Sequence, residues 1–198
     1  MPYKINEIFF SIQGEGLRAG TANIFVRFSN CNLRCDVTNE AGFSCDTEFL
    51  SGRDFSLGEL VSEIERVGRT CRNIIFTGGE PGLQLDNNLI EMLKGRGYYL
   101  CVETNGTVEL PVLLDWITVS PKTAEHTLRV KKAHELKYVR HAGQGIPKPA
   151  LEADAYLISP AFGSDGLDVE NLKWCINLVK ENPTWRLSVQ QHKIWRVR

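Results

Sequence analysis

The sequence predicts an α/β fold built as an abbreviated, open (partial) TIM-like barrel with about six or seven mainly parallel strands and few helices. Short apolar, β-branched or aromatic runs recur along the chain. Several are apolar on both faces, which is typical of parallel strands buried under helices. Only three clear helical patterns accompany them. The chain has 198 residues, whereas a complete eight-fold barrel typically needs about 250, so we expect an incomplete barrel.

The expected strands combine apolar, β-branched and aromatic residues. The first is "NIFVRFS", and the second, "NIIFTGG", ends in a glycine pair. Because helical patterns lie between some of these runs, we expect parallel pairing through right-handed crossovers. In chain order the expected strands occupy residues 23–29, 73–79, 98–104, 116–120, 135–139, 155–160 and 186–191.

Three helices are expected from their start signals and apolar periodicity. The first begins at Ser56, and Glu59 three residues later gives the spacing of a capping box. The second begins at Asp86 in "DNNLIEMLKGRG" and ends in glycines. The third, "DVENLKWCINLVKENP", carries an apolar stripe and stops at Pro183. The apolar face of the first helix is formed by Leu57, Leu60, Val61, Ile64 and Val67.

Length and composition are those of a globular protein, and we treat residues 1–198 as a single domain. The formal net charge is −1 and no basic block occurs, so nucleic acid is not an expected partner. No run of about 18 apolar residues occurs, so we expect no membrane span. The opening "MPYKINEIFF" lacks the features of a signal peptide, and we expect a cytoplasmic location.

Six cysteines are present, and a reducing compartment favours metal binding or catalysis over disulfides. Three of them lie beside or inside expected strands and a helix, which is typical of small buried hydrophobic residues. These three are Cys71, Cys101 and Cys175. The other three lie together in a polar loop and need a different explanation.

Cys31, Cys35 and Cys45 follow the strand at 23–29 with the spacing C-x3-C-x9-C. A structural zinc site usually takes four ligands in two close pairs, and no histidine falls within this loop. Three cysteinates on a [4Fe–4S] cluster leave one iron without a protein ligand. The amine and carboxylate of S-adenosylmethionine can chelate such an open iron. Zinc nevertheless remains an alternative on the cysteine pattern alone.

The surrounding motifs resemble those of the radical S-adenosylmethionine enzymes. "CNLRC" follows "FVRFSN", and "CDT" and "TGGEP" come later in the chain. That superfamily usually spaces its cysteines C-x3-C-x2-C, so the second gap is nine residues here rather than two. It often has an aromatic residue directly before the third cysteine, where this chain has Ser44, with Phe43 one residue earlier.

The resemblance narrows to one family. "NEIFFSIQGEGLRAGTANIFVRFSNCNLRC" is similar to the opening of the 7-carboxy-7-deazaguanine synthases of queuosine and 7-deazapurine biosynthesis. "VETNGT", "SPK", "ELKYV" and "LSVQQHK" continue the match in order over nearly the whole chain. The resemblance implies a partial barrel of the radical S-adenosylmethionine type.

The resemblance also implies a set of cofactor ligands. A [4Fe–4S] cluster would be held by Cys31, Cys35 and Cys45, and Mg²⁺ would be ligated by Thr47. The family more often has glutamine where Ser159 stands, in "ISPAF". The implied S-adenosylmethionine-binding residues are Gly78, Gly79, Glu80, Asn105, Ser120, Pro121, Lys122, Ser159, Pro160, Ala161 and Phe162.

Arg27 stands in an otherwise apolar strand, where an unpaired charge is costly. It either pairs with an acid such as Glu15 or receives an anionic substrate through its planar fork. The resemblance supports a substrate carboxylate. It implies catalytic roles for Glu15, Arg27 and His192. The implied substrate-binding residues are Ile12, Gln13, Gly14, Arg27, Thr77 and Arg198, the last through the terminal carboxylate.

The implied reaction is a radical-mediated ring contraction of 6-carboxy-5,6,7,8-tetrahydropterin to 7-carboxy-7-deazaguanine with loss of ammonia. The protein would be a carbon–nitrogen lyase that uses the [4Fe–4S] cluster, S-adenosylmethionine and Mg²⁺. An electron donor such as flavodoxin or ferredoxin and a homodimeric assembly are expected partners. Two alternatives stay open: a radical activating enzyme with a protein substrate, and a non-enzymatic zinc-binding module.

Overall fold

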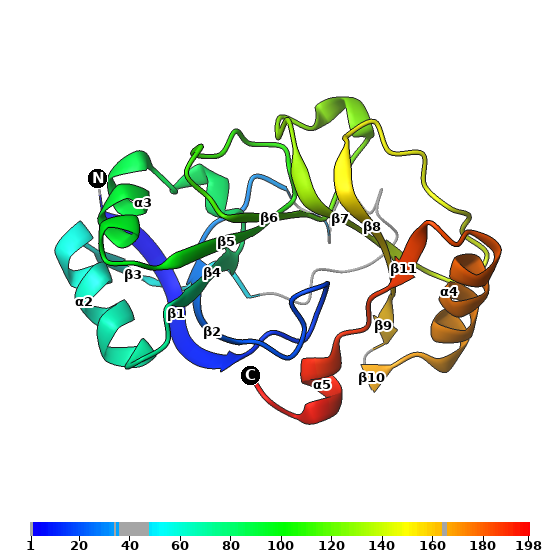
Figure 1. The fold of residues 1–198 in the computed structure, drawn as a ribbon, viewed down its shortest axis with the longest axis horizontal. Coiled ribbons are helices and arrows are strands. Elements are labelled where there is room, and N and C mark those ends of the chain that lie inside the picture. The colour runs from blue at the N-terminus through cyan, green and yellow to red at the C-terminus, as the bar shows by residue number, and fades with distance from the viewer. Residues whose placement is uncertain (1, 34, 36–47, 164–165) are drawn as a thin grey trace.

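A nine-stranded sheet in the order β11-β8-β7-β6-β5-β4-β2-β1-β3 forms the centre of the protein (Figure 1). The computed structural model describes residues 2–33, 35, 48–163 and 166–198. Seven consecutive strands of this order, from β11 to β2, run parallel to one another. They are β2 Ala22–Phe28, β4 Asn73–Gly78, β5 Tyr99–Thr104, β6 Trp116–Val119, β7 Ala133–Arg140, β8 Ala153–Pro160 and β11 Trp185–Leu187.

These seven parallel strands coincide with the seven expected runs, which confirms the prediction of a mainly parallel sheet in an open α/β fold. One boundary was wrong. The run expected at 186–191 leaves the sheet after Leu187, and a short helix, α5 Gln191–Trp195, begins where the strand was expected to end. Gln190 and Gln191, which favour helix over strand, cap and begin α5 instead.

Two antiparallel strands, which no sequence pattern predicted, complete one edge of the sheet. β1 Tyr3–Ile12 pairs with β2 and with β3 Arg53–Phe55. The register of β1 against β2 shifts between Ile5 and Glu7, so the period-two pattern is interrupted within the strand. β3 is only three residues long, too short for a pattern. β9 Phe162–Gly163 and β10 Gly166–Leu167 form a separate antiparallel pair.

The three expected helices are present as α2 Leu57–Gly68, α3 Asn87–Gly95 and α4 Val169–Glu181. The capping box of α2 forms as predicted, because Ser56 Oγ accepts from the Glu59 N–H and the Glu59 carboxylate accepts from the Ser56 N–H. Asp86 caps α3 by accepting from the N–H of Leu89 at 2.9 Å. Two single 3₁₀ turns, η1 Pro81–Leu83 and η2 Glu125–Thr127, follow strand ends.

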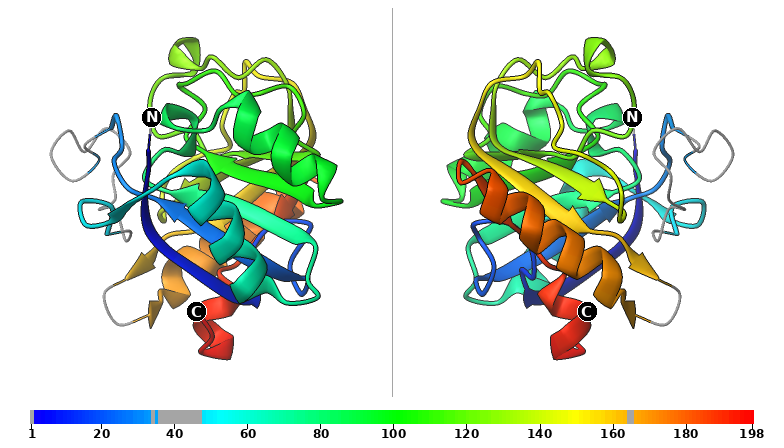
Figure 2. Two further views of the ribbon diagram at one scale, coloured as in Figure 1. Left: turned by 90° about the vertical axis from the view of Figure 1, so that its left-hand side faces the viewer. Right: turned by 90° about the vertical axis from the view of Figure 1, so that its right-hand side faces the viewer.

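The helices α2, α3 and α4 cover one face of the sheet. α2 and α3 lie at one end and α4 at the other, as Figures 1 and 2 show. Two apolar cores fill the space beneath them, and their largest fully buried side chains include Phe28, Ile74, Phe76 and Leu100. None of the helices in the described part of the chain is both long and apolar enough to cross a membrane.

The opposite, inner face of the sheet carries a small apolar cluster, and polar side chains follow it toward the carboxyl ends of the strands. Phe25, Ile75 and Cys101 pack together on three neighbouring strands, and the Phe9 ring stacks on Phe25 at a centroid distance of 5.0 Å. Side chains two residues further along a strand share its face. The next inward positions are therefore Arg27, Thr77 and Glu103. The charged side chains of this face lie toward the carboxyl ends of the strands.

Candidate cofactor and substrate site

The predicted motifs meet at one edge of the sheet. β2 ends at Phe28 shortly before Cys31, β4 ends at Gly78, and β5 ends immediately before Asn105. β6 ends at Val119, immediately before the "SPK" segment. Because these strands are parallel and adjacent, their carboxyl ends lie side by side, which is where α/β barrels build their sites.

The glycine pair of "TGGEP" is required by a close backbone approach. A Cβ on Gly78, which has φ of 111°, would lie 2.3 Å from the Phe28 carbonyl oxygen. A Cβ on Gly79 would lie 1.9 Å from the carbonyl oxygen of Asn30. The Gly79 N–H donates to Phe28 O and the Glu80 N–H donates to Asn30 O, both at 2.9 Å. The glycines therefore bond β4's end to the backbone that leads into the cysteine loop.

Glu80 is fully buried and joins two strand ends. Its carboxylate accepts from Thr104 Oγ1 at 2.7 Å, from the Asn105 N–H at 2.8 Å and from the Gly82 N–H at 2.9 Å. Burial raises the pKa of Glu80, and these hydrogen bonds oppose that shift. Glu80 is therefore not a solvated surface acid. Glu80 instead fixes the backbone of Asn105 beside the glycine pair.

Replacing Glu80 by glutamine is expected to lower the free energy of unfolding by about 1–3 kcal/mol, because an NH₂ group would face a buried donor. Urea denaturation of the metal-free protein measures the change. Glu91→Gln on the exposed surface of α3 is the matched control. Equal unfolding free energies for the two variants would contradict a structural role for the Glu80 carboxylate.

Asn105 contacts the cysteine loop. Its Nδ2 donates to Asn32 Oδ1 at 3.1 Å and lies 4.0 Å from Cys31 Sγ, which also accepts from the Leu33 N–H at 3.4 Å. Asn105 Oδ1 accepts from the N–H and the hydroxyl of Thr107 at 2.9 and 2.7 Å, so its side-chain orientation is fixed. The Cys31 sulfur therefore faces N–H donors, an environment that suits a thiolate.

Part of the predicted metal centre lies outside the described residues. Cys31 and Cys35 are described, and both are half-buried. Cys45 and Thr47, together with Phe43 and Ser44, fall among the residues whose geometry is not described. Within the described part of the chain, no three histidine, cysteine or acidic side chains come together as a metal site.

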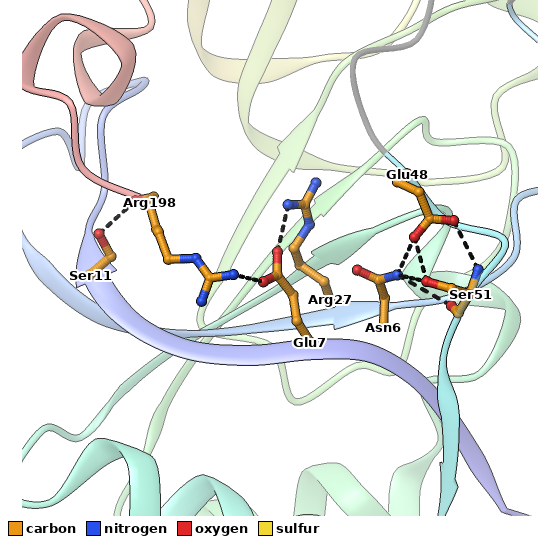
Figure 3. Close-up of polar contacts among 7 residues, drawn as sticks. All are labelled: Asn6, Glu7, Ser11, Arg27, Glu48, Ser51 and Arg198. Atoms are coloured by element: carbon orange, nitrogen blue, oxygen red, sulfur yellow. Dashed lines mark hydrogen bonds and ion pairs between the residues drawn. The ribbon is translucent and has the colours of Figure 1, made fainter.

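The chain that follows this loop is anchored to β1. Glu48 accepts from Asn6 Nδ2 at 2.6 Å and from the Ser51 N–H at 2.8 Å (Figure 3). Hydrogen bonds from Ser51, and further ones from Leu50 and Asn6, lower the pKa of the exposed Glu48 carboxyl to about 2. The Asn30 N–H donates to Phe49 O at 2.7 Å. The residues before Cys31 and the residues after Thr47 are thus held together.

Two more predicted cofactor segments occupy neighbouring strand ends. The Ser120 N–H donates to Thr104 O at 2.8 Å, and Lys122 Nζ donates to Ser120 Oγ at 2.9 Å, across the half-buried Pro121. At the end of β8, three residues are buried and the ring of the fourth, Phe162, lies 4.8 Å below Lys193 Nζ. The three buried residues are Ser159, Pro160 and Ala161.

The "IQGEG" loop follows Ile12, the last residue of β1, and packs against the start of α5. A Cβ on Gly14 would lie 2.4 Å from the His192 backbone nitrogen and 2.5 Å from its Nδ1. The Gln191 N–H donates to Gly14 O at 2.9 Å. Glycine at this position therefore permits the contact. Gly14, expected to bind substrate, and His192, expected to be catalytic, are far apart in sequence and neighbours in space.

Glu15 forms a buried ion pair with Lys137 on β7. Only 13% of the Glu15 side chain and 8% of the Lys137 side chain are exposed, and Gln190 Nε2 donates to the second carboxylate oxygen at 2.9 Å. Burial alone raises the pKa of Glu15, but the Lys137 ammonium and these hydrogen bonds outweigh burial and lower it below its ordinary value. Burial lowers the pKa of the adjacent His192, against the pull of Glu15. The site therefore holds an ionised carboxylate beside a neutral imidazole.

Further hydrogen bonds fix the loop around Glu15. Gln13 is buried; its Nε2 donates to Glu103 Oε1 at 2.6 Å, and its Oε1 accepts from the Glu15 N–H at 3.1 Å. The Gly16 N–H donates to Ser188 Oγ at 2.9 Å. These contacts come from β5 and from the residue that follows β11. The loop is thus bonded to both sides of the inner face.

Arg27 pairs with Glu7 rather than with Glu15, which corrects one of the two expectations for its partner. Arg27 Nη1 lies 2.8 Å from Glu7 Oε1, while Arg198 Nη2 lies 2.8 Å from Glu7 Oε2 (Figure 3). The Ser11 hydroxyl donates to the Arg198 backbone oxygen at 2.6 Å. Thr77 stands opposite Arg27 in the β2–β4 register. One acidic residue of β1 thus connects Arg27 to Arg198.

Several residues of this site were not predicted from the sequence, namely Glu7, Glu103, Lys137, Ser188 and Gln190. A usable signal existed for Lys137, which stands in the apolar strand "ELKYV" much as Arg27 stands in "IFVRFS". The cost of an unpaired buried charge applies equally to both. The other four are polar residues in ordinary surroundings, and only the fold places them together.

The remaining described cysteines are free thiols away from this edge. Cys101 and Cys175 are buried, and burial raises their pKa values to about 12 and about 11 respectively. Both are therefore uncharged packing residues, as expected. Cys71 is only half-buried and packs beside the core under α2 and α3.

No protein-family model matches the chain. Among solved structures, the crystal structure of QueE from Escherichia coli is similar, with a TM-score of 0.71 and 27% identity over 96% of this chain and 94% of that one. An open, mainly parallel α/β barrel with a cysteine loop and a glycine pair at its carboxyl edge defines the class of radical S-adenosylmethionine enzymes.

The curated relatives identify the family. The relatives from Bacteroides thetaiotaomicron and Bradyrhizobium diazoefficiens are each named 7-carboxy-7-deazaguanine synthase. They are 38% and 39% identical to this chain, and each match covers 100% of this chain and 100% of the relative. A third, from Nitratidesulfovibrio vulgaris, is 38% identical over 98% of each chain. The chain belongs to the 7-carboxy-7-deazaguanine synthase family, which confirms the resemblance found in its motifs.

Proposed function

We propose that the protein converts 6-carboxy-5,6,7,8-tetrahydropterin to 7-carboxy-7-deazaguanine with loss of ammonia. Family membership supports this reaction. One structural observation supports this reaction in addition to family membership. The buried, ionised carboxylate of Glu15 lies near His192 and is held by Lys137, within the inner face of the sheet. Such a carboxylate is suited to accept the N–H donors of a pterin ring.

A [4Fe–4S] cluster fits the donor set. Cys31 and Cys35, with Cys45, would supply three thiolates, and the N–H groups around Cys31 Sγ would stabilise its charge. Bound at that cluster, S-adenosylmethionine would supply the one-electron chemistry of the reaction. The Gly78–Gly79 backbone and Asn105 lie beside Cys31 and would bind the cofactor.

The other strand ends would complete the cofactor site. The segments 120–122 and 159–162 would contact S-adenosylmethionine, with backbone groups serving where Ser159 replaces the family's glutamine. Thr47 would ligate Mg²⁺, which prefers hard oxygen ligands, takes few of them from the protein and keeps several waters. The buried Glu80 would act here by holding Asn105 in place.

The protein's own groups would bind and orient the pterin. Arg27 would receive the substrate carboxylate through its planar fork, with Glu7 restraining the guanidinium. Gln13 and Glu15 would read the amino and amide edge of the ring, because one offers an amide and the other a carboxylate. Neutral His192 would hydrogen-bond the ring. Ile12, Gly14, Thr77 and Arg198 would line the remaining pocket.

We propose further that the chain acts as one domain in the cytoplasm, as a homodimer that receives its electron from flavodoxin or ferredoxin. The curated relatives match over the full length of this chain, which supports treating residues 1–198 as the functional unit. Neither nucleic acid nor a membrane is needed for a small-molecule reaction of this kind.

Anaerobic turnover tests the proposed function. The reconstituted protein is incubated with 6-carboxytetrahydropterin, S-adenosylmethionine, a reductant and Mg²⁺. The products are separated by chromatography and identified by mass spectrometry. A deazapurine is expected. Failure to form it with an intact cluster would remove the assignment and favour a radical activating enzyme. Stoichiometric zinc without iron after reconstitution would instead favour a zinc-binding module.

A further inference from the structure

We propose that Lys137 is a positioning residue of the pterin site, acting through Glu15. The inference rests on the proposed function and adds a residue to it. Lys137 lies at the middle of β7, and its ammonium contacts the Glu15 carboxylate on the loop that follows β1. A central strand is rigid, whereas a loop is not, so Lys137 gives the loop carboxylate a fixed anchor.

The geometry leaves Glu15 one orientation. One carboxylate oxygen contacts Lys137 Nζ, and the other accepts from Gln190 Nε2 at 2.9 Å. The Glu15 N–H is itself bonded to Gln13. Both members of the ion pair are about nine-tenths buried, so water does not compete effectively for either. The carboxylate's remaining lone pairs are those that a pterin would meet.

The Lys137 ammonium lies among several acidic side chains. Glu103 on β5 and Glu135 on β7 face the same region, and with Glu15 and Arg18 they line a small cavity of about 10 Å³. From α5, His192 and Lys193 act on this region as well, the former with a lowered pKa. The Arg18 guanidinium lies 4.7 Å from the centre of the Tyr99 ring. Among the charged groups of this region, Lys137 is the cation that pairs with Glu15.

Stability alone does not require this pair. A buried ion pair can often be replaced by apolar residues with little loss, since desolvation offsets the attraction. The flanking residues on β7, Leu136 and Tyr138, are buried in the core under α4 and hold the strand without Lys137. What Lys137 uniquely supplies is an ionised Glu15 in a fixed position.

Removing the ammonium changes how Glu15 titrates. With Lys137 in place, the ammonium holds the pKa of Glu15 below its ordinary value, so Glu15 stays ionised throughout the neutral range. Without it, burial in the company of Glu103 and Glu135 raises the pKa of Glu15. A protonated carboxyl accepts fewer N–H donors. Pterin affinity in such a variant therefore falls as the pH falls and recovers as the pH rises.

The test is calorimetric binding of 6-carboxytetrahydropterin to reconstituted, S-adenosylmethionine-loaded protein between pH 6 and 8.5. Lys137→Met is expected to bind about 10- to 100-fold more weakly at pH 7 than the unaltered protein, with affinity rising with pH. The readout is the difference between the two plots of pterin affinity against pH, because Glu15 in the unaltered protein does not change its protonation in this range. Lys94→Met, which breaks the Lys94–Asp115 pair beside α3, is the matched control and keeps full affinity.

A double-substitution cycle separates positioning from general structural damage. In a Glu15→Gln background, Lys137→Met is expected to cost less than about three-fold in affinity and to add no pH dependence, since its target carboxylate is gone. If Lys137→Met does not fold, Lys137→Gln, which keeps an N–H donor without the charge, is expected to show the same pH profile.

The outcomes are distinct. Pterin affinity and a pH profile equal to those of the unaltered protein in Lys137→Met or Lys137→Gln would overturn the inference, and so would full additivity with Glu15→Gln. Failure of the unaltered, cluster-loaded protein to bind the pterin would instead overturn the proposed function. Loss of affinity that is coupled to Glu15 and restored by raising the pH supports Lys137 as a positioning residue.

Discussion

Gly79→Ala is expected to prevent normal assembly of the cofactor site and to lower turnover by about 100-fold or more. The added Cβ would lie 1.9 Å from the carbonyl oxygen of Asn30; the Cβ is fixed by its own backbone and the oxygen is a backbone atom, so neither can rotate away. The backbone must shift, and this moves the residues that lead into Cys31. A displacement of about 1 Å in a catalytic arrangement can cost about 100-fold in rate.

Iron and sulfide content after reconstitution, together with the turnover rate, measure the effect of Gly79→Ala. Gly95→Ala at the end of α3 is the control, because no heavy atom lies within 4 Å of its added Cβ. It is expected to assemble the cluster and turn over normally. Normal cluster content and rate in Gly79→Ala would contradict the claim that the glycine pair bonds the cysteine loop to β4.

Arg27→Ala is expected to weaken binding of 6-carboxytetrahydropterin by about 10- to 100-fold while leaving cluster content unchanged. A charge-assisted hydrogen bond contributes about 1.5–3 kcal/mol, which corresponds to that range. Arg27 is part of the inner face, and its described partner is Glu7 rather than a group of the cysteine loop. Calorimetric binding and iron analysis measure the two quantities separately.

Two further variants sharpen this test of Arg27. Arg27→Lys retains the charge but not the planar fork, so an intermediate affinity is expected. Arg66→Ala removes an exposed ion pair with Glu63 on α2 and should leave pterin binding unchanged. Loss of the cluster in Arg27→Ala would make Arg27 a structural residue and contradict its assignment to the substrate.

Much of the fold could be predicted because the parallel strands are apolar on both faces. The runs that became β4 and β5 are recognisable without any tertiary information. β1 escaped prediction because its register shift at Ile5 and Glu7 breaks the alternation that marks a strand. β3 is short, and only its pairing with β1 makes it a strand.

Site residues that belong to a sequence motif could be predicted, whereas those placed only by tertiary contacts could not. The glycine pair and Asn105 followed from "TGGEP" and "VETNGT". The partner of Arg27 did not follow, because Glu7 lies on a strand that the pattern did not reveal. The buried role of Glu80 depends on donors from Thr104 and the chain after it, which no local pattern specifies.

The central claim is that the groups at the carboxyl edge form one site in which pterin and S-adenosylmethionine react. The most direct measurement is the molar ratio of 7-carboxy-7-deazaguanine formed to S-adenosylmethionine consumed during anaerobic turnover. We expect deazapurine and ammonia to form in equal amounts, with many equivalents of each for every S-adenosylmethionine consumed. Consumption of S-adenosylmethionine with no deazapurine, by protein with a full cluster, would contradict the account.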